Sequence, residues 1–321
     1  MKIVFTVCNR HQLPHALTLG ESLRRHNPEY HFTIGWVDAS PLAGLPDWVQ
    51  VMRADELGIS QWEAMTQRYY DFELLAASKP FFARFILQKN PSCTELIYLS
   101  PLIWVLGSLH EVVNPEKFFQ GTPHRLMPIK PNPHLDDKAI LNIGMYHAGS
   151  WVLHPDGQEN ELLDWWCERT VDRAHFNLCQ GMCLDQLWMN YLPVLFEGVK
   201  IIRNPGWHYG LHSVPNHSLT TNAGYLVDGQ PLLTVDFSGL ESYHPVWSDY
   251  TRLVDSNPAW TQLRKAYRRE FMAQTSPILE RESLPYGQSS GSKSFRKQRK
   301  GIIATLSRVI ERIETYDLTH N

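Results

Sequence analysis

The sequence predicts an α/β fold with a mostly parallel sheet flanked by helices. Short β-rich runs alternate with helical stretches through the first hundred residues. The second run, "HFTIGWVD" (31–38), is apolar on both faces, as is typical of a strand covered by helices on each side. With 321 residues, 43% of them hydrophobic, the chain is long enough to bury a large core.

The elements of the first half follow from hydrophobic spacing and from turn residues. A capping box, "SQWE" (60–63), is predicted to open one helix, and Pro80 is expected in the first turn of another. Pro101 has no N–H to give to a sheet, so it is expected to end one strand before the next begins. The predicted strands are 2–7, 31–38, 49–52 and one on each side of Pro101. The predicted helices are 16–26, 60–69 and 79–90.

The second half follows a proline-rich loop (123–133). Its predicted strands are 142–155, 198–205 and 231–239, and its predicted helices are 159–170, 183–196 and 258–273. The helix 159–170 is expected to face inward through Leu162, Leu163, Trp166 and Cys167. We therefore predict one domain over 1–275, a Pro/Gly/Ser-rich linker over 276–292, and a basic amphipathic helical tail over 293–321.

Composition excludes several classes of protein. The net charge of -3 and the absence of zinc-finger spacing argue against nucleic-acid binding. No run is long and apolar enough to span a membrane, no signal-peptide pattern opens the chain, and the odd count of five cysteines suits a reducing compartment. We expect a cytoplasmic protein. His175, Cys179 and Cys183 have zinc-like spacing, but a fourth ligand is missing and buried structural cysteines are favoured.

Several spaced segments carry a family resemblance. They are "FTVCNR", "LGISQWEAMTQRYYDFEL", "KPFFARFIL", "LIYLSPLIWVLGSL", "GSWVLHP", "LLDWW", "LDQLWMN", "IIRNPGWHYGLHS" and "DFSG". In this order the chain resembles nucleotide-sugar-dependent glycosyltransferases of the GT-A fold, related to glycosyltransferase family 8, from about Ile3 to Phe271. The sequence contains neither a G-x-G-x-x-G nor a P-loop motif that would favour another nucleotide fold.

The resemblance implies roles for particular positions. It implies that Val7, Cys8 and Asn9 border the nucleotide base, and that Lys79 and Arg84 lie beside the diphosphate and the donor sugar. Residues His147 to Gly149, with Asp185 and Gln186, match segments that line the sugar and acceptor pocket. In "DFSG", which ends at Gly239, Asp236 stands where the family usually has a histidine that helps to bind the metal. A structural hydrogen bond is the alternative role for this carboxylate.

The main departure from the family lies at Ser100 and Leu102. The family normally has Asp-x-Asp here, and the two carboxylates hold a Mn²⁺ or Mg²⁺ ion that stabilises the leaving nucleoside diphosphate. A hydroxyl and a hydrocarbon cannot replace them, so no metal ligand is predicted at this motif.

Three outcomes remain open. In the first, transfer is metal-independent and fixed positive groups stabilise the leaving diphosphate. Arg84 is the leading candidate for this role, and the lesser candidates are Lys79, Lys130, Arg203, His208 and His212. In the second, the metal has moved to Asp236 with Asp136, Asp137 or His134. In the third, the protein binds sugar nucleotide or glycan without turnover.

The expected function is transfer of a hexose from a nucleotide-diphosphate sugar, with a UDP-sugar favoured, to a hydroxyl of a bacterial-type surface glycan or lipid-linked saccharide. The resemblance suggests retention of anomeric configuration, with the departing phosphate taking the acceptor proton. The alternative is a catalytically silent glycosyltransferase-like subunit. Trp151 and Trp207 are candidates for stacking on sugar rings.

The tail differs in kind from the body. Its basic run precedes an apolar stripe at helical spacing, made of Ile302, Leu306, Val309 and Ile313. Such a helix can lie on an anionic membrane surface, or its stripe can dock on the body or on another subunit. Both alternatives place the contact within 293–316.

Overall fold

The structure is a computed structural model of the chain. It describes residues 1–42, 44–132, 135–221, 224–274 and 284–289 and, within the tail, residues 302, 305–306, 308–313 and 315–316. The predicted α/β class and mostly parallel sheet are confirmed.

A seven-stranded sheet forms the centre of the body. Its strands lie in the order β10 (Val199–Ile201), β6 (Phe119–Pro123), β7 (Tyr146–Leu153), β4 (Glu95–Leu99), β1 (Lys2–Cys8), β2 (His31–Trp36) and β3 (Val49–Arg53). All neighbouring pairs are parallel except the two that involve β7, which is antiparallel to both β4 and β6. The start of β7 therefore lies at the same edge of the sheet as the carboxyl ends of β1 and β4.

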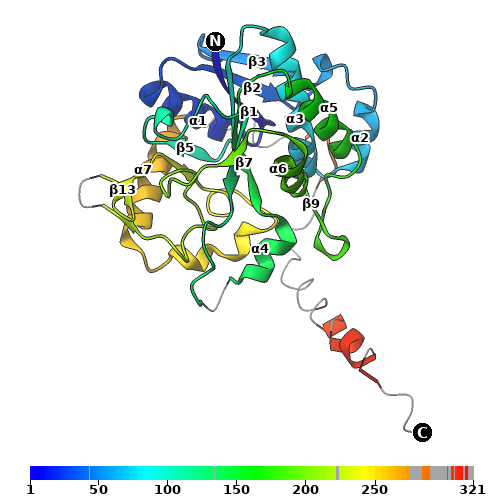
Figure 1. Ribbon diagram of the computed structural model, residues 1–321, viewed down its shortest axis with the longest axis vertical. Coiled ribbons are helices and arrows are strands. Elements are labelled where there is room, and N and C mark those ends of the chain that lie inside the picture. Colours follow the sequence, from blue (N-terminus) through cyan, green and yellow to red (C-terminus); the bar gives the residue numbers. More distant parts are fainter. Residues whose placement is uncertain are drawn as a thin grey trace.

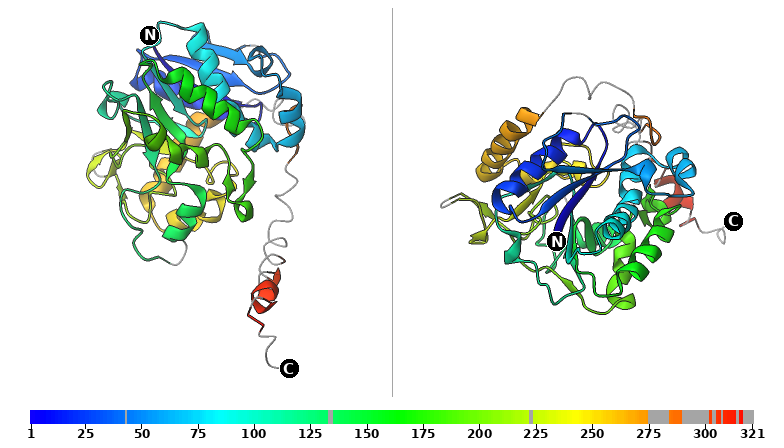
Figure 2. Two further views of the ribbon diagram at one scale, coloured as in Figure 1. Left: turned by 45° about the vertical axis from the view of Figure 1, so that its right-hand side comes forward. Right: turned by 90° about the horizontal axis from the view of Figure 1, so that it is seen from above.

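Helices cover both faces of the sheet (Figures 1 and 2). The helix α1 (Leu13–His26) lies on one face, and α3 (Asp71–Lys89) and α5 (Glu159–Thr170) pack together on the other. The alternation along β1 divides its side chains between these layers. Phe5 and Val7 join the core beneath α3 and α5, whereas Val4 and Cys8 join the core beneath α1.

Most of the remaining elements build a third core below the sheet edge where β1 and β4 end. Buried aromatic side chains dominate it, including Trp104, Trp247, Trp260 and Tyr267. The helices outside the two layers are α2 (Trp62–Arg68), α4 (Asp137–Ile143), α6 (Leu192–Leu195) and α7 (Pro258–Gln274). The short strands are β5 (Ile103–Val105), β8 (Phe176–Asn177), β9 (Met182–Cys183), β11 (Leu219–Thr220), β12 (Leu226–Val227), β13 (Gln230–Pro231) and β14 (Thr234–Asp236). The strand β14 pairs antiparallel with β5.

Two predictions about the helical part of the first half were wrong. The helix α2 begins after Gln61 and has no side-chain cap, so the predicted capping box at 60–63 does not form. Instead, Glu73 accepts the N–H of Tyr70 at 3.0 Å at the start of α3. Pro80 lies inside α3 and not in a first turn, because the helix already begins at Asp71.

In the second half, the structure differs from the prediction at several places. The strand β6 and the helix α4 lie in stretches for which no element was predicted. The segment predicted as one helix over 183–196 contains the end of β9, a 3₁₀ stretch over Gln186–Tyr191 and the short α6. The helix over 159–170 was predicted correctly, with the four inward side chains all buried.

The end of the chain is described only in part. Within the predicted linker, Gln288 donates its N–H to the carbonyl of Tyr69 at 2.8 Å and accepts the N–H of Asp71 at 3.1 Å, so residues 284–289 are anchored to the body. The tail side chains Ile302, Leu306, Val309 and Ile313 are exposed. No helix among the described residues is long and apolar enough to span a bilayer. The contact of the tail with a membrane or another subunit stays a prediction.

A buried histidine between α1 and α7 predicts a pH dependence of stability. The Nδ1 of His15 lies 2.6 Å from the hydroxyl of Tyr267, the ring stacks on Phe271, and burial lowers the pKa of His15 to about 4. The unfolded chain takes up this proton near pH 6.5, so stability is lost as the pH falls from about 6.5 to about 4. We expect this one group to remove about 3 kcal/mol over that range.

The measurement is the free energy of unfolding in urea across this pH range for the wild type, His15→Gln and the exposed-site control His31→Gln. The wild type and the control should lose stability more steeply than His15→Gln. Parallel curves for all three proteins would contradict the assignment.

Candidate functional site

A cleft opens at the sheet edge where β1 and β4 end and β7 begins. Its empty volume is about 700 Å³, including space open to solvent. The residues that line it are Val7, Gln12, Phe72, Leu75, Ala76, Lys79, Tyr98, Ser100, Pro101, Leu102, His147, Ala148, Gly149, Leu184, Asp185, Gln186, Ser238, Tyr243, His244 and Pro245. Eight of the positions singled out from the sequence are in this list: Val7, Lys79, Ser100, Leu102, His147, Gly149, Asp185 and Gln186.

The antiparallel pairing of β7 with β4 explains how distant segments meet here. Ser100, directly after β4, donates its N–H to the carbonyl of Gly149 at 2.8 Å. His147 and Gly149 thus lie beside the Ser-Pro-Leu break. A Cβ at Gly149 would come within 2.7 Å of the His208 ring and 2.8 Å of the His147 ring, so only glycine fits at this position without displacing a ring.

The helix α3 forms one wall of the cleft. Phe72, Leu75, Ala76 and Lys79 follow the i, i+3, i+4, i+7 spacing of one helix face. The Nζ of Lys79 donates to Asp185 Oδ1 at 3.0 Å and to the carbonyl of Ala148 at 3.3 Å, and it lies 5.1 Å from the centre of the Tyr98 ring. Lys79 is the one lysine or arginine among the described residues that line the cleft, and Asp185 is the one carboxylate.

Asp185 and Gln186 follow a strained residue. Leu184 has a φ of +55°, an uncommon value for a bulky side chain, and strain of this kind is concentrated at functional sites. Burial raises the pKa of Asp185, and Lys79 lowers it only in part. Gln186 accepts the N–H of Ala148 at 3.2 Å and donates to the carbonyl of Ile143 at 2.8 Å. The oxygen and the nitrogen of the Gln186 amide thus both bond to backbone groups, which suits a residue that positions the wall of the cleft.

Arg84 lies outside the cleft, which corrects its prediction as the group that replaces the metal. It is five residues after Lys79, and at 3.6 residues per turn the two side chains are separated by about 140° around the helix axis. Arg84 therefore faces α5, where its Nη1 donates to Asp164 at 2.8 Å in a solvent-accessible ion pair.

Four other predicted positions do not line the cleft. Cys8 points into the core beneath α1, where burial raises the pKa of its thiol far above the usual range. Asn9 is buried and accepts the N–H of His11 at 3.1 Å. Gly239 has a φ of +83°, and a Cβ there would come within 2.6 Å of the Trp247 backbone, so its role is local packing. Asp236 is buried behind the cleft wall, beside His147 and His208.

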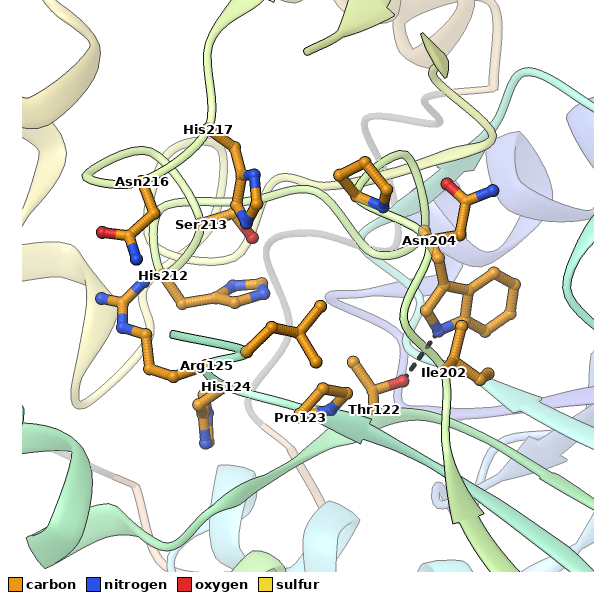
Figure 3. A pocket seen from close by; sticks show the side chains of 13 residues that line it. Thr122, Pro123, His124, Arg125, Ile202, Asn204, His212, Ser213, Asn216 and His217 are labelled. Atoms are coloured by element: carbon orange, nitrogen blue, oxygen red, sulfur yellow. Dashed lines mark hydrogen bonds between the residues drawn. The ribbon is translucent and has the colours of Figure 1, made fainter. Parts of the chain in front are cut away.

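Neither tryptophan of interest is available for stacking on a sugar in this cleft. Trp151 is fully buried against Phe5 and Trp166. Trp207 is 4% exposed, and its Nε1–H donates to the hydroxyl of Thr122 at 2.8 Å (Figure 3).

The spacing of His175, Cys179 and Cys183 does not form a helical face, because these residues lie in and between the short strands β8 and β9. Cys183 is buried as expected, but Cys179 is exposed, so a structural buried role was wrong for Cys179.

The residues present at the Ser-Pro-Leu break do not suit the divalent metal ion that the family resemblance implies. Leu102 offers a hydrocarbon, Ser100 offers a neutral hydroxyl, and the nearest carboxylate on the lining, Asp185, is paired with Lys79. The alternative metal ligands that were predicted to join Asp236 do not form such a site among the described residues. Asp136 caps α4, Asp137 accepts the N–H of Ile129, and His134 lies outside the described residues.

Sequence reasoning missed several residues at the site. Gln12, Phe72, Tyr98, Tyr243 and His244 line the cleft, and burial lowers the pKa of His244 to about 4, which keeps its ring neutral. It also missed a second, smaller cavity behind the cleft wall, shown in Figure 3. Thr122, Arg125, Trp207, His212 and Asn216 are among its lining residues. Phe72, Tyr98 and Thr122 lie on α3, β4 and β6, where the hydrophobic pattern predicts an element but not a site, and most of the others lie in loops without periodic spacing.

Comparisons with known proteins support the fold. No protein-family model matches the chain. A galactosyltransferase, LgtC, solved in complex with donor and acceptor sugar analogues, superposes with a TM-score of 0.50 at 12% identity, covering 86% of this chain and 97% of that one. The apo-form glycosyltransferase GlyE of Streptococcus pneumoniae TIGR4 matches at 10% identity over 84% of this chain and 64% of its own, with a TM-score of 0.45 that is too low to carry an argument.

A curated relative gives a sequence match. The uncharacterized protein YfnF of Bacillus subtilis (strain 168) is 26% identical over 172 residues, which make up 50% of this chain and 54% of YfnF. The chain thus spans about half the length of the curated relative it matches. Together with the sheet order, the likeness to LgtC identifies the fold as that of GT-A-type glycosyltransferases.

The two basic residues of α3 predict different effects on stability. Lys79→Met leaves the fully buried carboxylate of Asp185 without its partner, so we expect a loss of about 3–5 kcal/mol in the free energy of unfolding. Arg84→Met breaks a surface pair and should cost less than about 1 kcal/mol. Urea unfolding at neutral pH measures both. Similar losses for the two variants would refute the assigned environments.

Proposed function

We propose that the protein is a glycosyltransferase that moves a hexose from a nucleotide-diphosphate sugar, with a UDP-sugar favoured, to a hydroxyl of a glycan or lipid-linked saccharide. The observation that carries the proposal is the cleft itself. It gathers residues from β1, α3, the end of β4, the start of β7 and the loop at Asp185, which are the segments that the family resemblance assigns to the donor and acceptor.

The cleft suggests a division of roles among its side chains. Val7 and Gln12 are at the end of β1, where the nucleoside would bind. Lys79 is the charged group available to the diphosphate, and Gln186 fixes the wall that faces the sugar. Because Asp185 is held by Lys79, no carboxylate base stands free among the described lining residues. This supports the retaining route, in which the departing phosphate takes the acceptor proton.

A silent binding subunit is the second candidate function. It is favoured by a specific electrostatic observation: a diphosphate brings at least two negative charges, while the net charge of Lys79 and Asp185 is zero. Without a further source of positive charge, a leaving diphosphate is stabilised poorly and turnover falls by orders of magnitude.

An assay with a panel of UDP- and GDP-sugars separates the two functions. We expect free nucleotide to appear when a UDP-sugar and a saccharide acceptor are supplied. Loss of turnover with EDTA indicates an enzyme that needs a divalent ion, and turnover that persists with EDTA indicates a metal-independent enzyme. Binding of UDP without turnover, for every sugar and acceptor tried, would refute the enzyme and support the silent subunit.

Blocking the cleft tests whether this is the nucleotide site. Ser100→Tyr puts a ring at the end of β4, and we expect the affinity for UDP to fall at least about tenfold, or about 1.4 kcal/mol. Ser92→Tyr, at an exposed position before β4, is the matched control and should bind UDP as the wild type does. Isothermal titration calorimetry measures all three proteins. Equal affinities would place the nucleotide elsewhere on the chain.

A further inference from the structure

A cluster of buried histidines lies in the wall between the cleft and the second cavity. One ring nitrogen from each of His147, His208 and His212 lies within 4.8 Å of the other two. The ring centres are 4.2 Å apart for His147 and His208, and 5.0 Å apart for His147 and His212. None of the three side chains is more than 4% exposed.

The polar atoms of this cluster are poorly satisfied. His147 Nε2 and both ring nitrogens of His208 are buried and have no hydrogen-bond partner. Leaving buried polar groups without partners is costly, and each such group in a native protein calls for an explanation. Burial, followed by the neighbouring imidazoles, lowers the pKa of His147 and His212 far below the usual range, so these rings are neutral and each has a lone pair to give.

Asp236 completes the cluster. Its Oδ2 lies 3.6 Å from His147 Nε2 and 3.5 Å from His208 Nε2, which is too long for ordinary N–H···O hydrogen bonds. Four tetrahedral ligands at ~2.1 Å from a zinc ion leave their ligand atoms about 3.4 Å apart. The observed separations are close to that value. The other oxygen, Oδ1, accepts the N–H of Ser238 at 2.9 Å, which fixes the carboxylate toward the rings.

The backbone holds these ligands in place. His208 has a φ of +50°, an uncommon conformation that turns its ring toward the cluster, and its N–H donates to the Thr234 hydroxyl at 2.6 Å. Asp236, in β14, donates its N–H to the carbonyl of Tyr209 at 2.8 Å. The small size of Gly149 leaves room for the His147 and His208 rings. The arrangement is therefore built by several segments and does not depend on one mobile loop.

We propose that His147, His208, His212 and Asp236 form a binding site for a zinc-class divalent transition-metal ion, separate from the Ser-Pro-Leu break. Imidazole nitrogens with one carboxylate are a ligand set typical of zinc. Arg125, which lines the second cavity next to His212, opposes a cation there, so the ion belongs on the Asp236 side of the rings. Figure 3 shows His212 at this cavity, which gives a route of entry.

Binding has one structural consequence that can be observed. His147 Nδ1 now accepts the N–H of Gly149 at 3.0 Å, so the proton of the neutral ring is on Nε2. A metal at Nε2 moves that proton to Nδ1, and the ring must turn or this contact must lengthen. The amide resonance of Gly149 should therefore shift on addition of Zn²⁺ in an NMR titration.

The test uses Zn²⁺ and Co²⁺ as probes on the full chain, first stripped with EDTA and without any sugar nucleotide. We expect one Zn²⁺ per chain by mass spectrometry of the metal content, and a Co²⁺ absorption spectrum of tetrahedral nitrogen and oxygen ligands. His212→Ala and Asp236→Asn should weaken Zn²⁺ binding by at least about 100-fold. His217→Ala, which alters another histidine of the second cavity, is the matched control and should bind as the wild type does.

The outcomes are distinct from those for the glycosyltransferase proposal, because binding is measured with the metal alone. A metal content well below one ion per chain, or unchanged affinity in His212→Ala and Asp236→Asn, overturns the site. Circular dichroism checks that each variant folds. The wild-type Co²⁺ spectrum decides the question even where a variant does not fold, since an octahedral spectrum of water ligands also overturns the proposal.

Discussion

The buried ion pair of Lys79 and Asp185 is the interaction on which the cleft depends. It joins the middle of α3 to the loop after β9, across the start of β7, with Lys79 Nζ also bonded to the Ala148 carbonyl. Because Asp185 has 1% of its side chain exposed, neither charge can be left alone without a large penalty. The pair thus fixes the distance between two walls of the cleft, and it also uses up the only basic side chain of the described lining.

Buried charges at the neighbouring strand ends are also paired. Arg10, which follows β1, forms a two-pronged bond with Asp38, which follows β2, through contacts of 2.7 Å. Burial raises the pKa of Asp38, but the hydrogen bonds from Arg10 and from the Ser40 N–H, together with the charge of Arg10, lower it by more, so the carboxyl stays ionised. At the opposite edge, Glu95 is satisfied by His154, Tyr30 and Lys2. Most of the buried charges that the structure describes are paired, whereas Arg125, His147 and His208 have buried side-chain nitrogens without a hydrogen-bond partner.

The sequence predicted which segments line the cleft better than it predicted the helix boundaries, for a physical reason. Residues that follow parallel strands must gather at one edge, so Val7 and Ser100 could be assigned from strand order alone. His147 and Gly149 followed from the family resemblance, and the antiparallel β7 explains their presence. Arg84 failed because a motif gives a position on the chain and not a direction on the helix. The His147, His208 and His212 group was beyond reach because its members come from separate segments with no common period.

The replaced acidic pair and the histidine cluster are best understood together. The diphosphate of the proposed donor needs positive charge, yet Ser100 and Leu102 do not form a cation site and Lys79 is paired with Asp185. His147 is the residue that belongs to both places, since it lines the cleft and contributes a nitrogen to the cluster. An ion bound behind this residue would return positive charge to the cleft at low dielectric, where it acts strongly on a phosphate. The proposed zinc site thus removes the electrostatic objection that favours the silent subunit, and it does so with ligands that the altered motif does not supply.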